Sequence, residues 1–185
     1  MSESTIEILW YGRGGQGCFT AARLLGAAAT LYGGKCALAF PAFGPERRGA
    51  PVFGYTRIAD RPITDRSEIA AADCAVAMDE SLLSPIFWGR IRYGGTVLVN
   101  TRAEHITSVP TGIQVVPFDA ATLAQRILGK PIVNTALLGA LLGENPLIPL
   151  EAAERAVAHE FRGENAVLNG RVLREAYVQA AGGKR

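Results

Sequence analysis

The chain has 185 residues, of which 49% are hydrophobic and 19% are charged, and its formal net charge is +2. This is the composition of a globular protein long enough to bury a sizeable core, and it excludes a disordered chain. The small net charge gives no support for a nucleic-acid partner or for binding to an anionic membrane surface.

The cysteines and the N-terminus indicate a reducing compartment. Cys18, Cys36 and Cys74 are far apart, odd in number and never part of a C-x-x-C pair. A disulfide framework is therefore disfavoured, and so is a zinc or iron–sulfur site made by this chain. The N-terminal residues lack the pattern of a signal peptide, and no apolar run is long enough to cross a bilayer. We expect a cytoplasmic protein with no membrane insertion.

Apolar runs along the chain predict alternating strands and helices. The first strand is expected at residues 6–12, and the first helix at residues 16–32, where Gly33-Gly34 end it. Further strands are expected at residues 35–40, 52–63, 73–78, 96–100 and 113–118. Further helices are expected at residues 119–129, where Asp119 is a good N-cap, and at residues 132–143, 150–161 and 166–180.

This alternation predicts the fold class. Short apolar strands between helices are typical of an α/β protein, here a three-layer, Rossmann-like open sheet, mostly parallel, with helices on both faces. The sequence contains no internal repeat, no low-complexity segment and no linker. We therefore expect a single domain over residues 1–185.

A glycine-rich turn joins the first strand to the first helix: Gly12-Arg13-Gly14-Gly15-Gln16-Gly17. It satisfies G-x-G-x-x-G in the strand–turn–helix setting that gives the pattern meaning. Glycines let a ligand approach the backbone, and a helix N-terminus suits a phosphate or carboxylate. The six residues are candidates for cofactor binding, although a turn that only packs strand on helix is the alternative. If φ is positive at Gly14, a β-branched residue there should disrupt the turn.

A second test of the dinucleotide interpretation fails. An NAD site needs an acidic residue about 20 positions further on, at the end of the second strand. Residues 35–40 read KCALAF, and the first acid after them is Glu46, beyond Pro45. NAD(P) binding is therefore disfavoured. Contact with an anion, or with the phosphate of a cofactor held mostly by another subunit, fits the turn better.

The stretch FGPERRGAP, residues 43–51, places two arginines between glycines and prolines. If strands 6–12 and 35–40 are neighbours, this loop opens beside the glycine turn. Arg47 and Arg48 would then be suited to bidentate recognition of carboxylate or phosphate, and the prolines would limit the freedom of the loop. A solvated turn in which Glu46 pairs with one arginine is an equal alternative.

The sequence contains no recognisable catalytic motif. His105 and His159 are not in a metal-like or triad-like setting, and there is no nucleophile elbow and no P-loop. Asp79-Glu80 follows the predicted strand 73–78 and is better suited to cap the next helix than to acid–base work. No catalytic residue and no metal ligand is assigned, which indicates an accessory subunit or a binding module.

The two motifs in this order, about thirty residues apart, resemble those of the gamma subunit of 2-oxoacid:acceptor oxidoreductases of the pyruvate:ferredoxin type. The likeness also includes Arg57-Ile58, Pro62-Ile63 and the apolar strand that ends at Asp79, and it covers essentially the whole chain. The resemblance implies a Rossmann-like subunit that packs on catalytic subunits and helps enclose the active site or the coenzyme A site. It places the glycine turn and Arg47 and Arg48 on the edge that faces that site or a neighbouring chain.

The resemblance also implies cofactors and partners. These enzymes oxidatively decarboxylate a 2-oxoacid to an acyl-CoA with thiamine diphosphate, Mg²⁺ and 4Fe–4S clusters, carried by alpha-, beta- and delta-type subunits. This chain would bind none of these cofactors alone and would contact coenzyme A as cosubstrate. The oxoacid (pyruvate, branched-chain, 2-oxoglutarate or aryl glyoxylate) stays open, and so does the acceptor, ferredoxin or an NAD-linked subunit. The alternative is a stand-alone nucleotide-binding or regulatory module.

Overall fold

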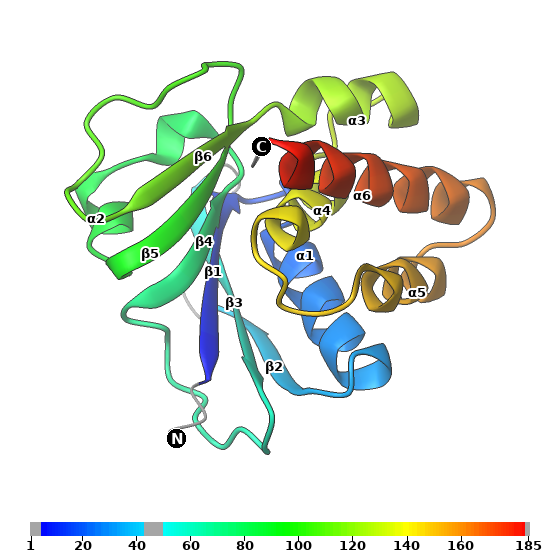
Figure 1. The fold of residues 1–185 in the computed structure, drawn as a ribbon, viewed down its shortest axis with the longest axis horizontal. Helices are drawn as coiled ribbons and strands as arrows, with labels where there is room; N and C mark the ends of the chain where they lie inside the picture. Colours follow the sequence, from blue (N-terminus) through cyan, green and yellow to red (C-terminus); the bar gives the residue numbers. More distant parts are fainter. Residues whose placement is uncertain (1–4, 43–49, 184–185) are drawn as a thin grey trace.

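The structure is a computed structural model, and it describes residues 5–42 and 50–183. Figure 1 shows a twisted sheet with the long helices gathered on one side of it. Most of the predicted arginine loop, including Arg47 and Arg48, lies outside the described residues.

Six strands form one sheet in the order β2-β3-β1-β4-β5-β6. β1, β4, β5 and β6 pair in parallel, whereas β3 runs antiparallel to both β1 and β2. The mostly parallel open sheet of an α/β protein is therefore confirmed. The strands are β1 (Ile6–Arg13), β2 (Cys36–Pro41), β3 (Pro51–Ala59), β4 (Ala72–Ala77), β5 (Ile91–Asn100) and β6 (Gln114–Phe118).

The five long helices begin and end near their predicted bounds, and two short helices had no predicted bounds. They are α1 (Cys18–Ala27), which continues as a π-helical turn (Ala28–Tyr32), a 3-10 helix (Glu80–Leu82), α2 (Pro85–Trp88), α3 (Ala120–Leu128), α4 (Asn134–Glu144), α5 (Leu150–Glu160) and α6 (Glu164–Gly182). Gly33 caps the π-helical turn as expected, and the Asp119 carboxylate accepts from Thr122 N at 2.9 Å as the predicted N-cap of α3.

Helices cover both faces of the sheet, but very unequally. The five long helices pack on one face (Figure 1), whereas α2 and the 3-10 helix accompany loops on the other. Along β1, Ile8 and Trp10 belong to the core beneath the long helices, and Leu9 and Tyr11 belong to the second core. The Trp10 indole donates to Thr56 Oγ1 at 3.1 Å, so its buried N–H is satisfied.

The condition set for the arginine loop, that strands 6–12 and 35–40 are neighbours, is not met. β2 does not pair with β1, because β3 lies between them. The connection between β2 and β3 is short, so these two strands pair antiparallel, because a parallel pair would need a long crossover. The first residues of β3 consequently lie beside the end of β1: Pro51 is opposite Arg13, and Gly14 N donates to Ala50 O at 3.1 Å. The last residues of the arginine loop, Ala50 and Pro51, therefore lie at the glycine turn because β3, not β2, pairs with β1.

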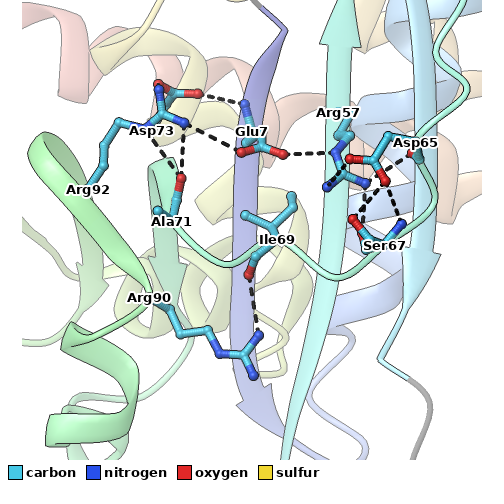
Figure 2. Close-up of polar contacts among 9 residues, drawn as sticks. All are labelled: Glu7, Arg57, Asp65, Ser67, Ile69, Ala71, Asp73, Arg90 and Arg92. Atoms are coloured by element: carbon cyan, nitrogen blue, oxygen red, sulfur yellow. Dashed lines mark hydrogen bonds and ion pairs between the residues drawn. The ribbon is translucent and has the colours of Figure 1, made fainter.

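A polar network holds the segment between β3 and β4 against the face of the sheet that lies away from the long helices. It lies at the start of β1, at the opposite end from the glycine turn (Figure 2). Arg57 on β3 is only 3% exposed and lies opposite Glu7 in the register of the sheet. Its guanidinium donates to Glu7 Oε1 at 2.9 Å and to the carbonyls of Asp65 and Ser67 at 3.0 and 2.7 Å. Arg57 thus anchors the segment between β3 and β4, which brings Ile69 into the second core.

Replacing Arg57 with lysine should destabilise the fold, because one ammonium group cannot reach Glu7 and both carbonyls together. For Arg57→Lys we expect the free energy of unfolding to fall by about 2–3 kcal/mol, since charge-assisted hydrogen bonds in a buried setting are lost. For Arg171→Lys, whose exposed side chain pairs with Glu175, the change should stay within about 0.5 kcal/mol. Urea denaturation of the purified chain measures both values, and equal losses would contradict the anchoring role.

Candidate functional site

The glycine turn lies at the carboxyl ends of β1, β4 and β5, where ligands bind in open α/β sheets. The chain leaves β1 into α1 on the long-helix face, whereas the 3-10 helix and α2 that follow β4 lie against the other face. The gap between β1 and β4 is therefore the topological switch point of the sheet. Two cavities flank the turn at this edge.

The conformation of the turn requires glycine at two of its positions. Among the described residues, φ is +94° at Gly15 and +83° at Gly17, and Gly17 is the N-cap residue of α1. A Cβ at Gly17 would also come within 2.8 Å of the Asn134 amide at the start of α4. Gly14 does not have a positive φ, so strain at Gly14 is not expected. The strain that we expected there belongs to Gly15 and Gly17.

The larger cavity, of about 460 Å³, lies between the turn and the start of β3. Phe53 forms a rigid part of its wall, because its ring stacks on Tyr11 with centroids 4.4 Å apart and the Arg90 guanidinium lies 5.1 Å from its centroid. The lining residues come from the turn, from the first turn of α1 and from the ends of β2 and β3: Arg13, Gly14, Gly15, Gly17, Cys18, Phe19, Thr20, Pro41, Ala42, Val52 and Phe53.

The chemistry of the larger cavity suits an anion that carries an apolar part. The N-terminus of α1 contributes a partial positive charge. Arg13 also lines the cavity, and its guanidinium donates to Ser81 Oγ at 3.0 Å. Phe19, which also lines the cavity, is 41% exposed and offers ring surface. A phosphate joined to a flat or apolar group would find complementary surfaces on both sides.

The smaller cavity, of about 240 Å³, lies at the switch point itself and contains a carboxylate. Burial acts to raise the pKa of Asp79, but hydrogen bonds from Ser81, the charge of Arg13 and a hydrogen bond from Gln16 outweigh it and hold that pKa below its usual value. Asp79 is consequently ionised at the switch point, which a dinucleotide crosses in this class of fold. Its negative charge is a second physical reason why NAD(P) is disfavoured.

The expected capping role of the Asp79-Glu80 pair is confirmed. Asp79 is the N-cap of the 3-10 helix, and its Oδ1 accepts from Ser81 N at 2.9 Å. The Glu80 carboxylate accepts from the Thr101 hydroxyl, which ties the 3-10 helix to the end of β5.

The structure brings together most of the predicted site residues. Arg13, Gly14, Gly15 and Gly17 line the larger cavity, and Gly15 and Gln16 line the smaller one. Gly12 lines neither cavity, since the Cys18 sulfur lies where its Cβ would be.

Sequence reasoning missed two residues of the site, Phe53 and Asn134. The start of β3 carried the signal for Phe53, because an antiparallel strand that follows a short loop brings its first residues back to the site. Nothing in the sequence pairs Asn134 with Gly17.

Chemically reactive groups are few in this region. Burial raises the pKa of the Cys18 thiol to about 12 and that of Cys74 to about 11, so both are protonated and unreactive at neutral pH. Within residues 5–42 and 50–183, no three His, Cys, Asp or Glu side chains gather in a way that could hold a metal ion. Across the same residues, every helix is too short or too polar to cross a membrane.

Fold and site together define an α/β protein with a glycine-rich strand–helix turn at the switch point of its sheet. Several known proteins are similar to this chain in sequence. A model of the pyruvate ferredoxin/flavodoxin oxidoreductase family matches residues 7–179. The chain is 43% identical over 179 residues to the "Pyruvate/ketoisovalerate oxidoreductases common subunit gamma" of Pyrococcus furiosus, which covers 93% of this chain and 95% of that protein.

Solved structures agree with this likeness. Pyruvate oxidoreductase subunit PORC of Thermotoga maritima superposes with a TM-score of 0.82 at 33% identity, over 95% of this chain and 96% of that one. The 2-oxoglutarate:ferredoxin oxidoreductase of Magnetococcus marinus gives a TM-score of 0.80 at 17% identity, over 98% of this chain and 32% of that larger chain, which shows the fold alone.

The chain therefore belongs to the pyruvate ferredoxin/flavodoxin oxidoreductase family. The predicted resemblance to gamma subunits of this family is confirmed.

Alanine substitutions at the two strained glycines should differ in their effect. Gly15→Ala places a Cβ in open space and should cost about 1–2 kcal/mol of folding free energy, from its left-handed φ alone. Gly17→Ala has the same strain and must also displace Asn134, so we expect a loss at least about 1 kcal/mol larger. Thermal or urea unfolding of the two variants compares them directly. Equal losses would mean that Asn134 does not pack tightly on the turn.

Proposed function

We propose that the chain is the gamma subunit of a multi-subunit enzyme that uses thiamine diphosphate and iron–sulfur clusters to convert a 2-oxoacid oxidatively to an acyl-CoA. In this proposal the chain is not catalytic alone, and it contributes the wall of the larger cavity to the coenzyme A site. One observation carries the proposal: the glycine turn, the start of α1 and Arg13 line one open cavity, in a chain of this family.

Coenzyme A has the chemistry that the larger cavity suits. Its phosphates match a helix N-terminus with an adjacent guanidinium group, and its adenine matches exposed ring surface. The Magnetococcus marinus enzyme, which contains this fold within a larger chain, holds 2-oxoglutarate, coenzyme A and succinyl-CoA. That likeness supports the proposal only through the shared fold.

Partner subunits would carry the remaining cofactors. In the proposed assembly, alpha-, beta- and delta-type subunits hold thiamine diphosphate, Mg²⁺ and the 4Fe–4S clusters, and this chain packs on them. Phe19 at the larger cavity and Ile132 at the smaller one are 41% and 48% exposed. Apolar side chains exposed at the mouths of two cavities favour contact with another protein chain at this edge.

Arg47 and Arg48 complete the proposed site. The described residues on either side of their loop, Ala42 and Ala50, both lie at the glycine turn, because Ala42 lines the larger cavity and Ala50 O accepts from Gly14 N. We propose that the two guanidinium groups bind coenzyme A phosphates. Interface ion pairs with a neighbouring subunit are the outcome to be distinguished by experiment.

The variant Arg47→Ala with Arg48→Ala tests this role in the assembled enzyme. We expect the KM for coenzyme A to rise about tenfold or more with little change in kcat, since charge-assisted hydrogen bonds to phosphate are lost. Steady-state reduction of a viologen dye at varied coenzyme A gives both constants. The matched control is Arg61→Ala with Arg66→Ala, two exposed arginines in the segment between β3 and β4. An unchanged KM in an intact complex would contradict coenzyme A binding, and a complex that dissociates would assign the arginines to an interface.

A further inference from the structure

We propose that the smaller cavity is a socket for the cationic end of an arginine or lysine side chain that a partner subunit supplies. The proposal rests on the assembly in the proposed function and deepens it, because it names the chemistry of one contact across that interface. Three observations carry it: the size of the cavity, the single charge that lines it and the apolar residues in its wall.

The smaller cavity has room for a side chain rather than for a cofactor. Its volume is about 240 Å³, whereas sites for small molecules usually measure about 300–1,000 Å³. Its walls come from the glycine turn, the ends of β4 and β5 and the start of α3, and they include Gln16, Met78, Asn100 and Ala121. A long side chain that enters from another protein would occupy a space of this size.

Asp79 supplies the only charge among the described residues that line this cavity. Burial acts to raise the pKa of Asp79, but the hydrogen bonds from Ser81 and the charge of Arg13 outweigh it, so the carboxylate is ionised at neutral pH. Its Oδ1 accepts from Ser81 N at 2.9 Å. A carboxylate has about four acceptor positions, so Asp79 can accept from a further donor.

The polar groups on the α3 side of the cavity are engaged within this chain. The Asn100 amide donates to Met78 O at 3.0 Å, and its oxygen accepts from Ala121 N at 3.2 Å. The next donor of α3, Thr122 N, is bound to Asp119 Oδ1. These N–H groups are therefore not available to an anion. The ionised carboxylate makes the cavity suited to a cation instead.

Apolar residues in the wall suit the aliphatic part of a basic side chain. Met78, Pro131, Ile132 and Val133 line the cavity, and Ile132 is 48% exposed. Arginine and lysine bury their methylene stems along apolar surface and keep the charged end at a polar partner. Such a side chain would therefore place its stem on these residues and its charge at Asp79.

Assembly gives a physical reason for a cation at this place. In the proposed complex, another chain packs on this edge of the sheet and takes Asp79 out of water. Burying an ionised carboxylate without a new partner is strongly unfavourable. A subunit that covers the edge therefore needs a compensating positive charge opposite Asp79, and such complementarity also selects the correct partner.

Substitutions at Asp79 test the charge. In Asp79→Asn the amide oxygen can still accept from Ser81 N, since asparagine is also a good N-cap, so the fold should be kept. Dilution of the assembled enzyme, followed by native mass spectrometry, gives the concentration at which half of the complexes have lost this chain. We expect that midpoint to rise about 30-fold or more in Asp79→Asn, and at least a further tenfold in Asp79→Lys, where like charges meet.

Asp60→Asn is the matched control for the loss of charge. Asp60 is exposed and pairs with Lys35, at the opposite end of the sheet from the glycine turn. Its substitution should change the dilution midpoint by less than about twofold. Urea unfolding of the purified chain confirms that Asp79→Asn and Asp60→Asn remain folded.

A second pair of variants tests the space independently of the charge. Ala121→Leu fills part of the cavity and leaves Asp79 unaltered, whereas Thr122→Leu adds the same side chain at the exposed neighbouring position of α3. Because the partner's side chain no longer fits, the dilution midpoint should rise about tenfold or more in Ala121→Leu. In Thr122→Leu it should change by less than about twofold.

Unchanged or tighter assembly of Asp79→Asn would overturn the proposal, since removing a carboxylate that has no cationic partner eases its burial. Lower stability of this variant in urea with unchanged assembly would place the cation within this chain and overturn it as well. Dye reduction that depends on coenzyme A, measured on the same samples, addresses the proposed function separately. A native complex that reduces no dye would contradict that function, while weaker assembly of Asp79→Asn would still support the socket.

Discussion

The position of β3, antiparallel between β1 and β2, is the constraint on which the rest of the site depends. It places the start of β3 beside the end of β1, so that Ala50 and Phe53 lie at the glycine turn. The chain leaves β2 at this edge and returns to the same edge in β3. Without β3 in this place, the larger cavity would lack the wall that Val52 and Phe53 form.

The glycine turn lies between two cavities. Asp79 lines the smaller one at the switch point, and the start of α1 and Arg13, whose charge also acts on Asp79, line the larger one. In dinucleotide-binding folds the ligand crosses the crevice at the switch point. Here the Asp79 carboxylate lies in that place, so we expect an anion to bind on the β3 side of the turn instead.

Sequence patterns could predict the α/β class, most element bounds and the glycine turn, because local periodicity and turn chemistry decide them. They could not place β3, although the short connection between β2 and β3 carried the signal, since parallel neighbours need a longer crossover. The strained positions were also missed: the sequence raised a positive φ only for Gly14, whereas the structure has it at Gly15 and Gly17. Contacts between distant residues, such as Asn134 on Gly17, depend on packing that no local pattern encodes.

The most direct test of the account is to isolate this chain by a tag from its own host and to determine what accompanies it. Native mass spectrometry gives the subunits, and thiamine and iron analyses with 2-oxoacid- and coenzyme A-dependent viologen reduction give the activity of the same sample. The account predicts a complex of several different chains that contains thiamine diphosphate and iron–sulfur clusters and requires coenzyme A. A monomer that binds a nucleotide and reduces no dye would contradict it.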